Sequence, residues 1–151
     1  KPQEKYNNFR KKNLLIDKFL IVYSGNMGYS SDLKTVVKAA SLLKKNEEVH
    51  FLLVGDGAIK NELVELASSL NLKNVTFLPF QDRKTFIQVL ASSDIGLITL
   101  NKNHVANIFL VTNFIFYLRV FKKFYVTFFK ITSLHIVRVI IIINEKIINF
   151  F

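Results

Sequence analysis

The chain has 151 residues, of which 50% are hydrophobic and 21% are charged, and its formal net charge is +10. This length suits one domain with appendages, and this composition excludes a disordered, solvating protein. The absence of cysteine excludes disulfides, thiolate metal sites and cysteine nucleophiles.

The first 18 residues predict a polar linker that leads into a domain. Basic residues alternate there with Asn and Gln around a weakly apolar stretch at 14–16. No apolar run of the required length follows residues 1–12, so this pattern does not indicate a secretory leader. Because the chain starts at Lys1 without a Met, we interpret it as a piece of something longer.

Residues 19–100 predict alternating strands and helices. Continuous β-rich runs indicate four strands, at 19–23, 49–54, 75–78 and 95–100. Apolar residues at helical spacing indicate three helices, over about 33–45, 59–70 and 83–92. Such an order builds a parallel sheet with helices on both faces, which is the Rossmann-like α/β fold class.

Residues 101–151 differ from the rest of the chain in composition. They lack Gly, Pro and Asp, hold nine of the fifteen Phe, and carry a net charge of +6, against +4 for residues 1–100. We expect an irregular or helical, apolar and basic tail with one β-prone run at 140–143. Its longest uncharged stretch, 103–118, is shorter than the roughly 20 apolar residues of a membrane span.

Three strand-to-helix loops carry the candidate functional residues, because parallel sheets bind ligands at the carboxyl ends of their strands. Residues 25–28 and 55–57 are glycine-rich, so their amides could approach an anion at a helix start. The same glycines also suit simple turns, and capping of the next helix is the role we expect for the Asp56 side chain. In the third loop, Phe80 and Gln81 could bind the aromatic ring of a ligand and its edges. Alternatively, Phe80 could pack within the protein while Asp82 caps the helix that follows.

Other chemical signals are weak. The three histidines lack metal-ligand spacing, no nucleophile elbow is present, and the carboxylates form no acid/base pair, so we predict no metal and assign no catalytic residue. Basic and aromatic residues interleave at 119–130 without a defined stacking platform, and no nucleic acid partner is expected. The first loop lacks Gly-x-Gly-x-x-Gly, which argues against a dinucleotide.

Four segments in register resemble a known family: Phe-Leu-Ile-Val-Tyr-Ser-Gly-Asn-Met-Gly at 19–28, Val-Gly-Asp-Gly at 54–57, Val-Thr-Phe-Leu-Pro-Phe at 75–80 and Ala-Ser-Ser-Asp-Ile-Gly-Leu at 91–97. They are similar to the donor-binding domain of GT-B glycosyltransferases, which have two Rossmann domains. The likeness is greatest to the group 1 bacterial family of capsule, exopolysaccharide and colanic-acid-type synthesis. It runs from about Asn8 to residue 100.

The resemblance implies transfer of a sugar from a nucleotide-sugar, a UDP- or GDP-sugar, to a saccharide or lipid-linked acceptor, without a cofactor. It also implies cytoplasmic localisation, with a peripheral place at the inner membrane face as an option. The donor-binding residues that it implies are Gly25, Asn26, Met27, Gly28, Gly55, Asp56, Gly57, Phe80 and Gln81. Asn26 stands where many relatives have Arg, and the nearest lysine is Lys34.

The resemblance covers only part of a two-domain enzyme. On this resemblance we expect this sequence to lack the acceptor domain, and nothing in residues 101–151 matches the family's downstream carboxylate that binds the donor ribose. We therefore expect a donor-domain fragment, with a linker at 1–18 and the partial domain at 19–100, that is inactive alone. The alternative is a non-catalytic nucleotide-binding module, or one associated with a membrane surface through its tail.

The tail suggests its own hypothesis. Its wealth of Phe, Ile, Asn and Lys is typical of an out-of-frame translation of AT-rich coding sequence. The other two frames of the encoding DNA test this, because a family-like continuation should appear in one of them. A genuine membrane-surface extension is the rival interpretation.

Overall fold

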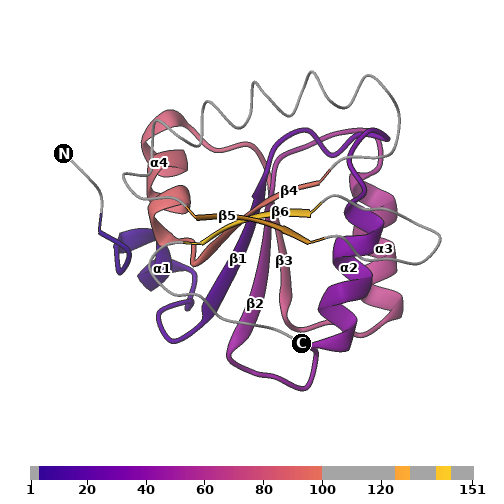
Figure 1. The fold of residues 1–151 in the computed structure, drawn as a ribbon, viewed down its shortest axis with the longest axis horizontal. Helices are drawn as coiled ribbons and strands as arrows, with labels where there is room; N and C mark the ends of the chain where they lie inside the picture. The colour runs from indigo at the N-terminus through magenta and orange to yellow at the C-terminus, as the bar shows by residue number, and fades with distance from the viewer. Residues whose placement is uncertain (1–3, 100–124, 130–138, 144–151) are drawn as a thin grey trace.

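The computed structural model describes residues 4–99, 125–129 and 139–143. The four strands predicted for a Rossmann-like sheet are β1 (Phe19–Ser24), β2 (Val49–Val54), β3 (Val75–Leu78) and β4 (Ile95–Ile98). They pair in parallel in the order β3-β2-β1-β4 (Figure 1). The predicted α/β fold class is therefore confirmed for this part of the chain.

Helices cover both faces of this sheet. The strands are connected by α2 (Leu33–Leu42), α3 (Lys60–Ser69) and α4 (Arg83–Ser92). Figure 1 shows α2 and α3 together on one side of the strands, with α4 on the other side beside the short helix α1 (Asn8–Lys12). Helix α2 ends slightly earlier than predicted, because the amide of Leu43 bonds back to the Ala40 carbonyl in a tightened last turn.

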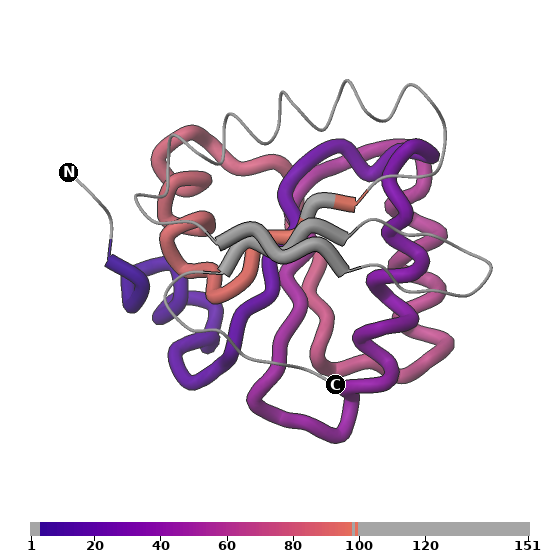
Figure 2. The backbone as a smooth tube through the Cα atoms, in the orientation of Figure 1, coloured from indigo at the N-terminus to yellow at the C-terminus, as the bar shows by residue number. Residues whose placement is uncertain are grey.

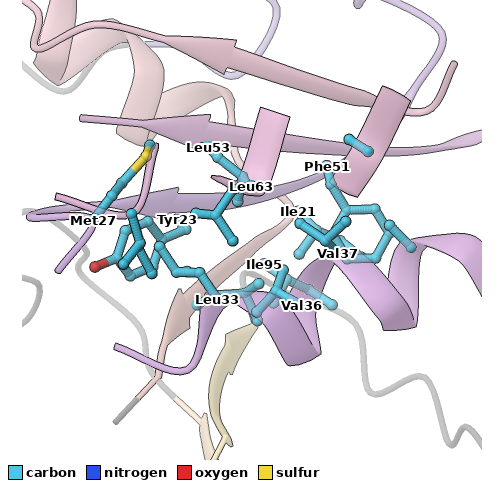
Figure 3. Close-up of a cluster of buried hydrophobic side chains, with 14 of the residues drawn as sticks. Ile21, Tyr23, Met27, Leu33, Val36, Val37, Phe51, Leu53, Leu63 and Ile95 are labelled. Carbon is cyan, nitrogen blue, oxygen red and sulfur yellow. The ribbon is translucent and has the colours of Figure 1, made fainter. Parts of the chain in front are cut away.

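Two separate apolar clusters fill the space between the sheet and its helices. Tyr23 of β1 faces α2 and α3, in the larger cluster with Met27 and Leu33 (Figure 3). Its neighbour Val22 points to the opposite face, in a smaller cluster with Phe9 of α1. Successive strand residues point to opposite faces, so burial on both sides explains why β1 is a continuous apolar run.

The segment before β1 docks against the domain through a buried arginine. Arg10 is 0% exposed and donates to the main-chain oxygen atoms of Leu15 at 2.9 Å and Lys18 at 2.7 Å. Its Nη2 donates to Oδ2 of Asp94 at 2.6 Å, and this oxygen also accepts from the amide of Leu20 at 2.9 Å. From residue 4 on, the linker expected over residues 1–18 is thus a docked segment, because the guanidinium also bonds to Asp94 and to the carbonyl of Ser92 in the domain.

Ten described residues of the tail form strands. They are β5 (Tyr125–Phe129) and β6 (Val139–Ile143), and they pair antiparallel with each other. Strand β6 also pairs antiparallel with β4, which extends the sheet order to β3-β2-β1-β4-β6-β5. Strand β6 falls on the run at 140–143 that the sequence predicts to be β-prone. The expectation of an irregular or helical tail is wrong for β5, a segment rich in residue types that favour strands. The uncharged stretch at 103–118 lies outside the described residues.

Candidate functional site

Two glycine-rich loops lie side by side at the carboxyl ends of β1 and β2. We call residues 25–28 the first glycine loop and residues 55–57 the second. The amide of Gly25 donates to the carbonyl of Val54 at 3.0 Å, and the amide of Met27 donates to the carbonyl of Asp56 at 2.8 Å. Both strands end at the same side of the molecule (Figure 2). The structure therefore brings together the two loops that the sequence singled out.

Glycine is required in the second loop by this close approach. A Cβ atom on Gly55 would overlap the carbonyl oxygen of Gly25, and φ of Gly55 is 144°. A Cβ atom on Gly57, whose φ is 153°, would lie 2.5 Å from the carbonyl oxygen of Met27. Side chains at these positions would push the loops apart and are strained by the backbone itself. The two loops consequently approach each other here through main-chain atoms.

Buried side chains fix the first glycine loop from the side of the protein core. Met27 is 0% exposed and belongs to the larger core cluster, so only its main chain is available at the loop (Figure 3). The Tyr23 hydroxyl donates to the carbonyl of Asn26 at 2.8 Å, and burial raises the pKa of Tyr23, so this group stays protonated. The Ser31 hydroxyl donates to the carbonyl of Gly28 at 2.7 Å. The Asn26 side chain is left exposed.

The helices that follow the two glycine loops begin without a side-chain cap. The residue preceding α2 is Asp32 and that preceding α3 is Ile59, and neither side chain bonds to the first helical amides. In α4, by contrast, Asp82 accepts from the amides of Lys84 at 2.9 Å and Thr85 at 3.1 Å, which confirms its predicted capping role. Bonds from Thr85 to this carboxylate lower the pKa of Asp82. The first amide of each helix bonds to a main-chain carbonyl, that of Leu33 to Ser31 and that of Lys60 to Gly57. The next amides of α2 and α3 remain suited to an anion.

Asp56 has a different role from the one expected. Helix α3 begins at Lys60, so Asp56 lies too far before it to cap, and the capping prediction is wrong. Its carboxylate lies 3.4 Å from Nζ of Lys60, with the Asp56 side chain 57% exposed and the Lys60 side chain 20% exposed. Nζ of Lys60 also donates to the carbonyl of Gly55 at 3.0 Å. The sequence gives no sign of this last contact.

The third loop presents an aromatic ring at the same edge of the sheet. Phe80 is 62% exposed, so the alternative that it serves as a packing residue is wrong. Gln81 is held locally, because its Nε2 donates to the carbonyl of Pro79 at 2.8 Å. The carbonyl of Leu78, at the end of β3, accepts from the amide of Gly55 at 2.9 Å. Main-chain bonds thus run from β3 through the second glycine loop to the first.

No group of three or more His, Asp or Glu side chains within 4–99, 125–129 and 139–143 could hold a metal ion. Across these same ranges, none of the helices has the length and apolar character needed to cross a membrane.

Comparison with known proteins gives one family. The family model described as "Glycosyl transferases group 1" matches residues 5–107. The chain is 34% identical over 82 residues to the putative colanic acid biosynthesis glycosyl transferase WcaI of Escherichia coli (strain K12). That match covers 54% of this chain and 20% of the relative, so the chain spans about a fifth of the relative's length.

Solved structures agree on the fold. WaaG, a glycosyltransferase involved in lipopolysaccharide biosynthesis, has a TM-score of 0.53 at 17% identity, covering 64% of this chain and 26% of that one. The Anabaena protein Alr3699/HepE in complex with UDP has a TM-score of 0.52 at 18% identity, covering 67% and 29%. The same Anabaena protein in complex with UDP and glucose has a TM-score of 0.51 at 21% identity, covering 60% and 25%.

Proposed function

Because this chain belongs to the group 1 glycosyl transferases, we propose that its α/β part binds a nucleotide-sugar and contributes to sugar transfer. The donor is a UDP- or GDP-sugar and the acceptor is a saccharide or lipid-linked saccharide. The complexes of Alr3699/HepE with UDP and glucose support this class of donor. The name of WcaI supports a polysaccharide product.

One observation carries the proposal: the two glycine loops bond to each other through their main chains. Gly55 and Gly57 allow this approach, and the helices beyond both loops lack side-chain caps. A diphosphate needs several N–H donors and gains from the positive end of a helix dipole. The amides of Gly25, Met27 and Gly55 are already bonded within the fold. The donors that the loops offer are the remaining amides, beside the starts of α2 and α3, and they are those of Asn26, Gly28, Asp56 and Gly57.

Each predicted site residue then has a donor-binding role. Gly25, Asn26 and Gly28, with the main chain of Met27, lie beside the diphosphate or the sugar. Gly55 and Gly57, with the main chain of Asp56, form the adjoining wall of the site, and the Asp56 carboxylate is exposed. Phe80 offers its exposed ring to the nucleobase, and Gln81 offers an amide to the edge of that base. We assign these residues to binding of the donor. We assign none of them to the bond-breaking step.

Calorimetric titration of the full chain with UDP and with GDP tests the proposal. We expect saturable heat with one of them, and a weaker association in Gly28→Ala. Gly28 is buried, and a Cβ there would lie 3.0 Å from Nδ2 of the exposed Asn26, a flexible side-chain end. This variant should therefore fold normally while displacing the Asn26 side chain at the loop. Lys45→Ala, an exposed position before β2, is the control. The absence of heat from folded protein with either nucleotide would contradict the proposal.

A further inference from the structure

An anionic ligand at the paired glycine loops needs a counter-charge, and the sequence restricts where it can come from. No Lys or Arg occurs from residue 19 to residue 33, from 46 to 59, or from 74 to 82. Each of the three loops is therefore free of basic residues. The first cation after each loop stands at the start of the next helix, and these three cations are Lys34, Lys60 and Arg83.

The three cations differ in their surroundings. Lys34 has a side chain that is 54% exposed and pairs with Glu62 at 2.6 Å, which raises the pKa of Lys34. Arg83 is exposed and begins the helix that Asp82 already caps. Lys60 alone of the three is bonded to a glycine loop, through the carbonyl of Gly55 at 3.0 Å. Its side chain is mostly buried, at 20% exposed.

The bond to Gly55 determines where the ammonium of Lys60 lies. Gly55 is the residue whose Cα approaches the carbonyl of Gly25 so closely that no Cβ fits between them. An ammonium held on Gly55 is therefore held near the contact between the two glycine loops. Its one carboxylate neighbour, Asp56, lies 3.4 Å away with a side chain that is 57% exposed. Because the carboxylate partner is exposed and 3.4 Å away, the pair is held weakly on that side, and a phosphate could replace the carboxylate at low cost.

We propose that Lys60 is the cation that binds the phosphates of the donor. The inference rests on the proposed donor-binding function and adds the residue that supplies the charge. In the free protein Asp56 holds the ammonium beside the loops. When the donor binds, the ammonium keeps its bond to Gly55 and turns a second N–H from Asp56 to a phosphate oxygen, while Asp56 faces solvent.

A phosphate series tests the role of Lys60. Uridine, UMP and UDP are titrated into the full chain and into Lys60→Met, with the guanosine series used instead if the wild type prefers GDP. We expect Lys60→Met to lose about tenfold or more in affinity for UDP, the range of a charge-assisted hydrogen bond. The loss should shrink for UMP and vanish for uridine. Lys34→Met, at the start of the equivalent helix, is the matched control and should bind UDP as the wild type does.

Two further variants distinguish a loss of phosphate binding from a loss of folded structure. Lys60→Arg retains the charge and should retain most of the UDP affinity. Asp56→Asn removes an exposed carboxylate that competes for Lys60, so it should bind UDP more tightly than the wild type. A structural role for Lys60 would instead weaken uridine and UDP equally.

The outcomes separate this inference from the proposed function. If the wild type binds neither UDP nor GDP, the proposed function fails and the assignment of Lys60 fails with it. If the wild type binds UDP, three results overturn the assignment of Lys60 alone: unchanged affinity in Lys60→Met, equal losses across the phosphate series, or weaker binding in Asp56→Asn.

Discussion

The Cα atom of Gly55 lies so close to the carbonyl oxygen of Gly25 that a Cβ at position 55 would overlap it. The two residues lie on separate loops, and the amide of Gly25 is bonded to the neighbouring carbonyl of Val54 at 3.0 Å. This contact joins two strand ends through their main chains. The account of donor binding depends on it.

Gly55→Ala should therefore destabilise the fold severely. The variant combines a steric overlap with a φ of 144°, which an alanine adopts only under strain. We expect a loss of about 3 kcal/mol or more in the free energy of unfolding, measured by urea denaturation. Gly28→Ala is the matched control and should stay within about 1 kcal/mol of the wild type. Equal stability of the two variants would contradict the close approach of the loops.

The buried ion pair between Arg10 and Asp94 should be essential for stability. The Arg10 side chain is 1% exposed and that of Asp94 is 11% exposed. In Arg10→Met, Asp94 loses its buried partner, and breaking such a pair costs about 3–5 kcal/mol. In Lys5→Met, Asp94 loses a partner that is 37% exposed, and the expected cost is about 0–1 kcal/mol. Urea denaturation measures both variants, and similar small losses would show that α1 is not docked as described.

His50 should make stability depend on pH. Burial lowers the pKa of this imidazole, the nearby charge of Lys18 lowers it further, and its Nε2 lies 2.8 Å from the Thr76 hydroxyl. Below the ordinary His pKa of about 6.5, the unfolded chain binds a proton that the folded chain resists. Stability is therefore highest above that pH and falls as the solution is acidified.

His50→Gln isolates this contribution. The variant should lose less stability than the wild type between pH 7 and pH 5, as measured by thermal unfolding at a series of pH values. The comparison with the wild type removes the effect of all other titrating groups, including His104 and His135. If stability changes with pH in the same way in both proteins, His50 titrates alike in the folded and unfolded chain, and the prediction is contradicted.

The fold and the adjacency of the two glycine loops were predictable from the sequence, because both follow from local patterns. Apolar runs and helical spacing predicted β1 to β4 and α2 to α4 within a few residues. Glycines directly after two strands predicted that the loops share one edge of the sheet. The capping role of Asp82 was similarly local, since it depends on amides two and three residues away.

The remaining features depend on distant contacts that no local pattern reveals. Arg10 resembles any lysine or arginine of a polar linker, and its partner Asp94 lies 84 positions away. Lys60 resembles an ordinary helix-start cation until its bond to Gly55 is seen. Met27 resembles an exposed loop residue, although its side chain is a core element. Only the folded arrangement distinguishes these residues from their neighbours in the chain.

Glycine-selective ¹⁵N labelling tests the central claim most directly, because the chain contains only five glycines. Four lie in the two glycine loops, and Gly96 lies within β4, paired with Val22, as an internal control. On titration with UDP or GDP, we predict that the amide signals of Gly25, Gly28, Gly55 and Gly57 shift with one common saturation curve while Gly96 moves little. Four unmoved loop signals at saturating concentrations of both nucleotides would contradict donor binding at the paired glycine loops.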